Sequence, residues 1–226
     1  MINQRSKCKQ TVIKAVQYLF IGAVMAGGLA GCSQTDETSG TIKQSRPTKF
    51  SDDYHQSYAQ IIQELGQTIQ NQSLSTDINH QFVSTMLNHQ QAAVMMAYVQ
   101  LKFGSDKQAL NIAQRSIDIQ QAQMAWMRQW LANDALTHER TEQSPHLAFN
   151  GYESYDTQTL ITAANSQTAD KAFIHLMQMH QLQAIHMAEQ ALEMGLDAEV
   201  AALAEDIIIT QTTELKALQN WLHDAD

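Results

Sequence analysis

Residues 173–194 read FIHLMQMHQLQAIHMAEQALEM, a run without proline or glycine in which most residues are good helix formers. Positions spaced alternately by four and three share one helix face, which a helix in a bundle turns toward its neighbours. We call this face the seam, and in this stretch it consists of Phe173, Met177, His180, Ala184, Met187, Ala191 and Met194. A histidine, His180, therefore occupies a core position where leucine is usual.

The same pattern occurs earlier in the chain. Residues 80–132 align without a gap with residues 171–223, at an offset of 91 positions, and fifteen aligned pairs are identical. An ungapped match of this density indicates an internal duplication. Each copy contains a helix, a short Gly-x-Asp turn that begins at Gly104 or Gly195, and a second helix. This order predicts one αα-hairpin per copy.

Two hairpins with facing seams predict an all-α protein with a ferritin-like four-helix bundle. A further N-terminal helix is expected over residues 52–72, packed against the outside of the bundle. Residues 133–168 are expected to form a long crossover with a short helix at 157–164. The bundle domain is therefore predicted to span residues 52–226.

The first 31 residues have the composition of a secretory signal. Four basic residues and no acidic ones precede the apolar run YLFIGAVMAGGLAG. This run ends in Leu29-Ala30-Gly31-Cys32, which looks like a bacterial lipobox, so Cys32 is expected to carry a lipid. A plain secretory signal or membrane anchor with a chance cysteine is the alternative. Ser33 follows, which by the sorting rule for such lipoproteins resembles an outer-membrane address facing the periplasm. Residues 32–51 are predicted to be a disordered tether.

Charge and cysteine content narrow the class of ligand. Without residues 1–31 the chain keeps 10 of its 14 Lys+Arg and all 23 Asp+Glu, a net charge of −13. This balance argues against nucleic acid as a partner and is compatible with binding cations. The two cysteines are Cys8, in the predicted signal, and Cys32. A soft metal would therefore have to be bound by methionine and histidine.

The seam contains the first set of candidate metal ligands. In an antiparallel hairpin, residues equidistant from the turn share a layer, so His89 should face Gln120 and His180 should face Gln211. One explanation is a buried hydrogen-bonded network with methionine filling the core. The other is a copper site, because imidazole and thioether suit Cu(I). The candidates are Met86, His89, Met96, Met177, His180 and Met187.

A second set of candidates lies off the seam. His175, Met179 and His186 are spaced by four and seven residues, so they share another helix face. The equivalent residues of the first copy are Ser84, Asn88 and Met95. This stripe favours a partly exposed copper site. The alternative is a face covered by the N-terminal helix or by the partner in a homo-oligomer.

Enzymatic function is not predicted. A carboxylate-bridged di-iron bundle needs Glu-x-x-His motifs, and the chain contains none. It also lacks a Gly-x-Ser-x-Gly motif, a phosphate loop and a His-Glu-x-x-His motif.

The two hairpins resemble the bacterial "domain of unknown function 305" family. Its first helix typically reads Met-x-x-His-His-x-Gly-Ala-x-x-Met-Ala, and its second ends Gln-x-x-Glu-x-x-x-Met-x-x-Trp-Leu. The matching residues are Met86, His89, Gln91, Ala93, Met96, Ala97, Gln120, Met127, Trp130 and Leu131 in copy one and Met177, His180, Ala184, Met187, Ala188, Gln211, Glu214, Trp221 and Leu222 in copy two.

The resemblance implies a ferritin-like bundle outside the cytoplasm and, in some members, copper binding or copper tolerance through His and Met. The chain departs from the family pattern in both copies. The second histidine is Gln90 or Gln181 here, the glycine is Ala92 or Gln183, and Gln123 replaces the glutamate in copy one. A site that has lost the second histidine would be weaker, or would be rebuilt from Met179 and His186.

The sequence thus leads to two hypotheses. The first is a lipid-anchored envelope protein that binds copper, as Cu(I), for buffering, sequestration or tolerance. The second is a structural or interaction lipoprotein whose His/Gln/Met core binds no metal.

Overall fold

The computed structural model describes residues 50–71, 75, 77–137, 157–166 and 168–225. The chain divides into two units, Met1–Arg46 and Pro47–Asp226, and all described residues lie in the second. The predicted signal, the lipidation of Cys32 and the crossover over residues 138–156 therefore fall outside the described residues. So does the predicted tether, except for residues 50 and 51.

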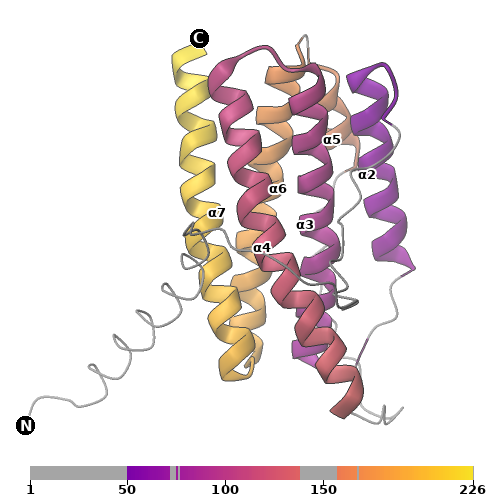
Figure 1. Ribbon diagram of the computed structural model, residues 1–226, viewed down its shortest axis with the longest axis vertical. Helices are drawn as coiled ribbons and strands as arrows, with labels where there is room; N and C mark the ends of the chain where they lie inside the picture. The colour runs from indigo at the N-terminus through magenta and orange to yellow at the C-terminus, as the bar shows by residue number, and fades with distance from the viewer. Residues whose placement is uncertain (1–49, 72–74, 76, 138–156, 167, 226) are drawn as a thin grey trace, which may run out of the picture. The chain divides into compact units, whose positions relative to one another are not determined.

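The described part of the chain consists of helices and contains no strand, which confirms the all-α prediction (Figure 1). The short helix expected at residues 157–164 is present with the same bounds. The helices are α2 (Tyr54–Gln70), α3 (Ile78–Phe103), α4 (Lys107–Thr137), α5 (Thr157–Ala164), α6 (Ala169–Met194) and α7 (Ala198–Ala225).

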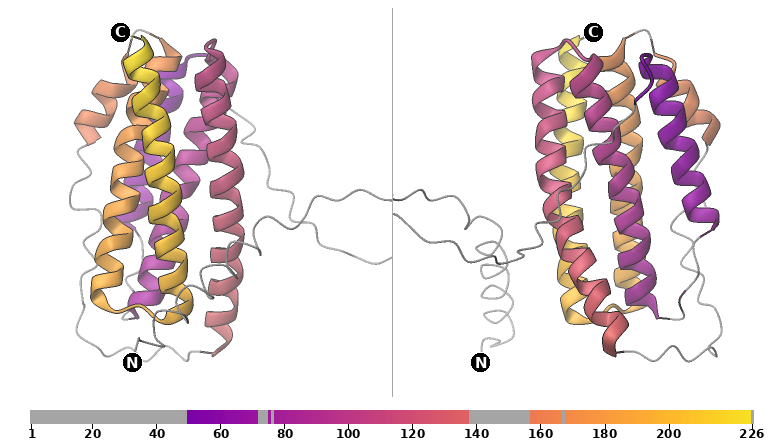
Figure 2. Two further views of the ribbon diagram at one scale, coloured as in Figure 1. Left: turned by 90° about the vertical axis from the view of Figure 1, so that its left-hand side faces the viewer. Right: turned by 45° about the vertical axis from the view of Figure 1, so that its right-hand side comes forward.

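Four long helices form the bundle. Helices α3 and α4 make the first hairpin and α6 and α7 the second, with α3 packed against α6 and α4 against α7. Helix α2 packs outside the bundle against α3 and α5, as the right view of Figure 2 shows. This arrangement follows the prediction of two paired hairpins with an added N-terminal helix.

The two hairpin turns use their glycines differently. Gly195 ends α6 with φ of 92°, a left-handed conformation that side-chain-bearing residues rarely adopt. Gly104 ends α3 with φ of −71° and extended backbone. Asp106 then caps α4, because its Oδ1 accepts the backbone N–H of Ala109 at 2.8 Å.

Each hairpin turn is also held by the first turn of a helix from the other hairpin. Asn79 of α3 accepts the backbone N–H of Asp197 at 2.9 Å and donates to its carboxylate at 3.2 Å. Asp170 of α6, which lies at the same offset of 91 positions from Asn79, accepts the backbone N–H of Ser105 at 3.1 Å and that of Asp106 at 3.3 Å. The duplication thus produces two equivalent locks between the hairpins.

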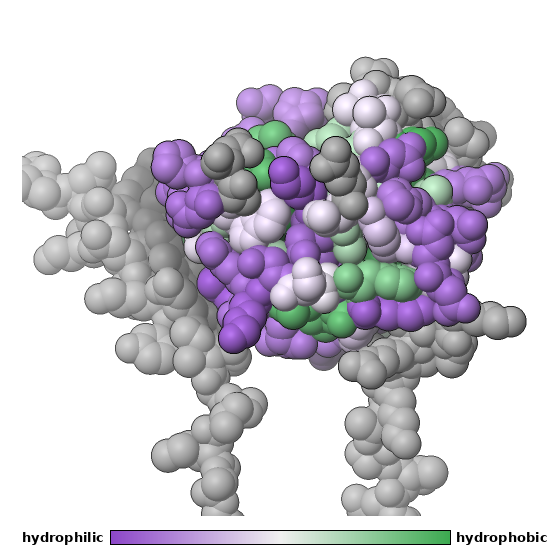
Figure 3. Space-filling view, turned by 90° about the horizontal axis from the view of Figure 1, so that it is seen from above, coloured by the Kyte–Doolittle hydropathy of each residue, from purple (hydrophilic) through white to green (hydrophobic). Residues whose placement is uncertain are grey.

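The core is mainly apolar, with buried polar side chains both near its centre and beside the hairpin turns. Phe82 and Phe173, equivalent in the repeat, are both fully buried, as is Tyr58 of α2. Phe50 packs against this core, so the end of the predicted tether belongs to the folded unit. The end of the bundle seen from above is mostly hydrophilic, with small separate hydrophobic patches (Figure 3). No helix among the described residues has the length and hydropathy needed to cross a membrane.

Candidate functional site

The seam candidates lie in the core of the bundle, on α3 and α6. His89 is 0% exposed and His180 is 2% exposed. The four seam methionines are buried with them: Met86, Met96, Met177 and Met187. In each helix one methionine lies three residues from the histidine, so imidazole and thioether are about one turn apart.

The two seam histidines stack on each other. The ring centroids of His89 and His180 are 3.6 Å apart, and the ring planes differ by 15°. Nε2 of His89 also lies 3.4 Å from Oε1 of Gln183 on the other hairpin. The sequence placed each histidine opposite a glutamine of its own hairpin, and Gln120 and Gln211 are indeed buried. It did not predict the contact between the two hairpins.

Burial keeps both imidazoles neutral. Loss of solvation lowers the pKa of His89 from 6.5 to about 3, against a smaller opposing effect of Gln183. Loss of solvation also lowers the pKa of His180 well below its usual range, and the neighbouring His89 lowers it further. Two adjacent neutral rings can stack without charge repulsion.

A buried layer of polar side chains joins the helices of each hairpin. Gln90 Nε2 donates to Gln123 Oε1 at 2.7 Å in the first hairpin. The equivalent pair in the second hairpin is Gln181 Nε2 donating to Glu214 Oε2 at 2.8 Å. The position of the family's second histidine is thus a glutamine that links the two helices of its own hairpin.

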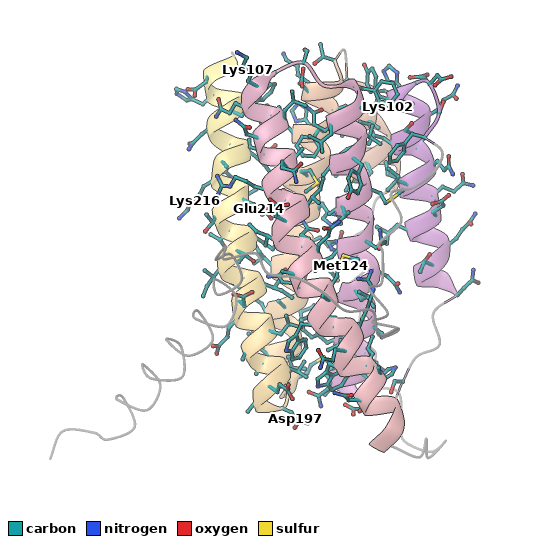
Figure 4. All side chains as sticks on the ribbon, in the orientation of Figure 1. Lys102, Lys107, Met124, Asp197, Glu214 and Lys216 are labelled. Atoms are coloured by element: carbon teal, nitrogen blue, oxygen red, sulfur yellow. The ribbon has the colours of Figure 1, made fainter. Side chains whose placement is uncertain are left out.

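The same layer connects α4 with α7. Ser116 Oγ donates to Glu214 Oε1 at 2.6 Å, and Gln123 Nε2 donates to Asp206 Oδ2 at 2.8 Å. Glu214 points into the bundle from α7 (Figure 4). Burial raises the pKa of its carboxyl, while the bonds from Ser116 and Gln181 oppose that shift. The sequence matched Glu214 to the glutamate of the family pattern, but its partners could not be read from the repeat.

The stacked geometry does not suit one metal ion shared by both rings. An imidazole nitrogen carries its ligating lone pair in the plane of the ring, and metal–nitrogen bonds are about 2 Å long. Nearly parallel stacked rings direct these lone pairs side by side rather than toward one point. Among the described residues, no three His, Cys, Asp or Glu side chains gather closely enough to hold a metal ion. A site would therefore need methionine.

The off-seam stripe lies on the outer part of α6. His175 and Met179 are half-buried, and His186 is exposed. Met179 also packs against the edge of the core. Between these residues lies Leu182, which is 55% exposed.

Helix geometry divides the stripe. His175 and Met179 are one turn apart, about 6 Å along the axis, which is within reach of a single ion. His175 and His186 are eleven residues apart, about 16 Å along the axis, which is too far for one ion. The three residues predicted together thus contain one close donor pair and one separate histidine.

Comparison with known proteins places these features in a wider group. The family model described as "Domain of unknown function (DUF305)" matches residues 31–131 and 79–222. A comparison with curated proteins finds no match.

Solved structures share the fold. A DUF305 fragment from Deinococcus radiodurans is 24% identical, with a TM-score of 0.52, and the match covers 67% of this chain and 99% of that chain. CopM in the Cu(I)-bound form is 23% identical, with a TM-score of 0.50, over 65% of this chain and 96% of that chain. A putative secreted DUF305 protein from Streptomyces coelicolor is 21% identical, with a TM-score of 0.50, over 65% and 93%. At these identities the likeness shows the fold alone.

Proposed function

Because this chain belongs to the DUF305 family, which its two matches over residues 31–222 show, we propose that it is an envelope lipoprotein that binds copper as Cu(I). Histidine and methionine side chains would hold the ion, for buffering or sequestration. The shared fold with CopM, which has been solved with Cu(I) and with Cu(II) bound, supports a copper ligand. A protein that binds copper without catalysing a reaction requires only donor side chains such as histidine and methionine.

The observation that carries the proposal is the pair His175 and Met179 on α6. Both are half-buried, one turn apart, and outside the set of fully buried core residues. The first copy has Ser84 and Asn88 at the equivalent positions, so the fold does not require an imidazole and a thioether there. Half-buried donors are accessible to an incoming ion, and their softness suits Cu(I).

The seam favours the second hypothesis for its own residues. Its histidines are neutral, stacked and buried beside a hydrogen-bonded layer, which is what a packed structural core requires. Binding a metal ion to the seam residues would require the stacked rings of His89 and His180 to separate. If no copper binds anywhere, the chain is a structural or interaction lipoprotein.

The anchor and the location belong to the same proposal. The lipobox-like ending at Cys32 and the serine after it support a lipid-anchored protein of the outer membrane that faces the periplasm. In that location a copper buffer would meet ions entering the envelope.

Competition with a chromogenic Cu(I) chelator, under reducing and anaerobic conditions, tests the copper ligands of the purified protein. The double variant His175→Ala/Met179→Ala should bind Cu(I) at least about tenfold more weakly, a loss of about 1.4 kcal/mol of binding free energy. The matched control is Ser84→Ala/Asn88→Ala at the equivalent positions of the first copy, which should bind as tightly as the wild type.

A seam variant, His180→Ala/Met187→Ala, completes the comparison. If the seam variant is the only one that fails to bind Cu(I), the ion is bound in the core and the assignment to the outer face is wrong. If the wild type itself shows no binding and no rise in melting temperature with Cu(I), the protein is not a copper protein, because a ligand of the native state must stabilise it.

A further inference from the structure

A second potential site lies at the end of the bundle where α6 turns into α7. It is a hollow of about 370 Å³ between the last part of α4 and the start of α7. Its lining consists of two indoles, two amides and three carboxylates: Trp126, Trp130, Gln129, Asn133, Asp134, Asp197 and Glu199. Asp197 marks this end in Figure 4, and Lys102 and Lys107 lie at the opposite end.

The repeat supplies an internal comparison for this hollow. At the other end of the bundle, the indole Nε1 of Trp221 donates to Asp106 Oδ1 at 2.7 Å, and Trp221 is only 7% exposed. The equivalent residues of the hollow are Trp130 and Asp197. Trp130 is half-buried, so it is more accessible to solvent than Trp221. The same two positions thus make a closed contact at one end and an open hollow at the other.

The two ends of the bundle also differ at one aligned pair. Asn79 donates its side-chain amide to Asp197 Oδ2 at 3.2 Å. The equivalent residue at the closed end, Asp170, instead accepts the backbone N–H groups of Ser105 and Asp106.

The lining carries negative charge and two aromatic rings but no lysine or arginine. Asp134 is bonded to Nδ1 of His80 at 2.8 Å, and Glu199 is exposed. A glutamate in the first turn of α7 also stabilises that helix, so Glu199 has a structural reason to be there. Trp126 and Trp130 are half-buried: they pack against the hydrophobic core and also line the hollow. Rings and carboxylates together attract cations that carry apolar groups.

We propose that this hollow binds a small organic ammonium cation with its methyl or methylene groups against Trp126 and Trp130. The positive charge lies among the carboxylates of Asp134, Asp197 and Glu199. The site is independent of the proposed copper donors, His175 and Met179, which lie on α6.

Titration with choline and with its uncharged isostere 3,3-dimethyl-1-butanol tests the proposal, with the indole N–H signals followed by NMR. Choline should shift the Trp126 and Trp130 signals in a saturable way and leave Trp221, buried and bonded to Asp106, unchanged. The neutral isostere should bind at least about tenfold more weakly, because the attraction of a ring for a cation depends on its charge.

Two variants and one control locate the site. Trp130→Leu and Glu199→Gln should each weaken choline binding severalfold, whereas Glu205→Gln, an exposed acid elsewhere on α7, should not. The Trp221 signal reports whether each variant is folded. If Trp130→Leu does not fold, Glu199→Gln alone tests the proposal. Equal binding of the two compounds, or choline binding that neither folded variant weakens, would overturn the proposal.

Discussion

Glu214 and Gln123 occupy equivalent positions in the two hairpins, yet only Glu214 can ionise. Both lie in the buried polar layer, and each accepts an amide N–H from the first helix of its own hairpin. Because burial raises the pKa of Glu214, the native state holds a proton there more tightly than the unfolded chain does. The stability from this group is complete below its unfolded pKa near 4.5 and is lost as the pH rises through the native value.

Glu214→Gln should therefore stabilise the protein at pH 8 and have less effect toward pH 4.5. A glutamine can accept from Gln181 and donate to Ser116, so both hydrogen bonds can be kept. The expected gain is about 1.4 kcal/mol for each unit by which burial raises the pKa. Urea unfolding at several pH values measures it.

The reverse exchange, Gln123→Glu, is the matched control. It places a second carboxylate beside Asp206, to which Gln123 now donates, and should destabilise the protein at pH 8. A loss of stability at pH 8 in Glu214→Gln would contradict this account, because it would mean that the ionised carboxylate is the favoured native form.

The stacked histidines should make the metal-free protein less stable in acid. Their native pKa values lie below 6.5. Below that pH the histidines of the unfolded chain therefore bind protons, whereas those of the native state stay neutral. Each histidine should cost up to about 1.4 kcal/mol per pH unit between roughly pH 6 and 4. Measurement in the Glu214→Gln background removes the opposing effect of the glutamate. An NMR titration in which both His89 and His180 become protonated near pH 6.5 would refute this prediction.

At the scale of helices, the locks between hairpins show what a duplicated sequence can specify. Asn79 and Asp170 each hold the turn of the opposite hairpin, so the first helix of one copy positions the second copy. The bonds are made to turn residues distant in sequence. A turn held in this way keeps the two helices of a hairpin in register.

Asp170→Ala should destabilise the protein by about 1–3 kcal/mol, because the buried side-chain amide of Gln100 and the partly buried N–H groups of Ser105 and Asp106 lose their acceptor. Thermal or urea unfolding at pH 7 measures the change. Glu205→Ala, an exposed acid on α7, should shift stability by less than about 0.5 kcal/mol. Equal effects of the two substitutions would show that the lock contributes nothing.

Local patterns predicted the helices well because spacing and turn residues act over short distances. The repeat located both hairpins, and the bounds of α5 were those expected. The stacking of His89 on His180 was not predictable, since it depends on how the hairpins dock and on Gln183 at the family's glycine position. The hollow at Trp130 was also missed, although the aligned pair Asn79 and Asp170 marks a chemical difference between copies.

For the whole molecule, the proposed anchor determines where the bundle works. If Cys32 is lipidated, the wild-type chain should be recovered in the membrane fraction of bacterial cells, and Cys32→Ser should appear in the soluble envelope fraction. The matched control is Cys8→Ser, which lies in the predicted signal and should remain anchored. Recovery of Cys32→Ser with the membranes would rule out a lipid on this residue as the anchor.

The whole molecule combines a structural core with a proposed binding face. The core contains the stacked imidazoles and the polar layer common to both hairpins, whereas the outer face of α6 has no counterpart in the first copy. The proposed Cu(I) site belongs to that face.

An NMR titration of the purified protein with one equivalent of Cu(I), following the imidazole signals, tests this division most directly. The His175 ring and the Met179 methyl signal should shift together, while the signals of His89 and His180 should keep their metal-free positions. Shifts confined to His89 and His180, with His175 unchanged, would place the ion in the core and contradict the account.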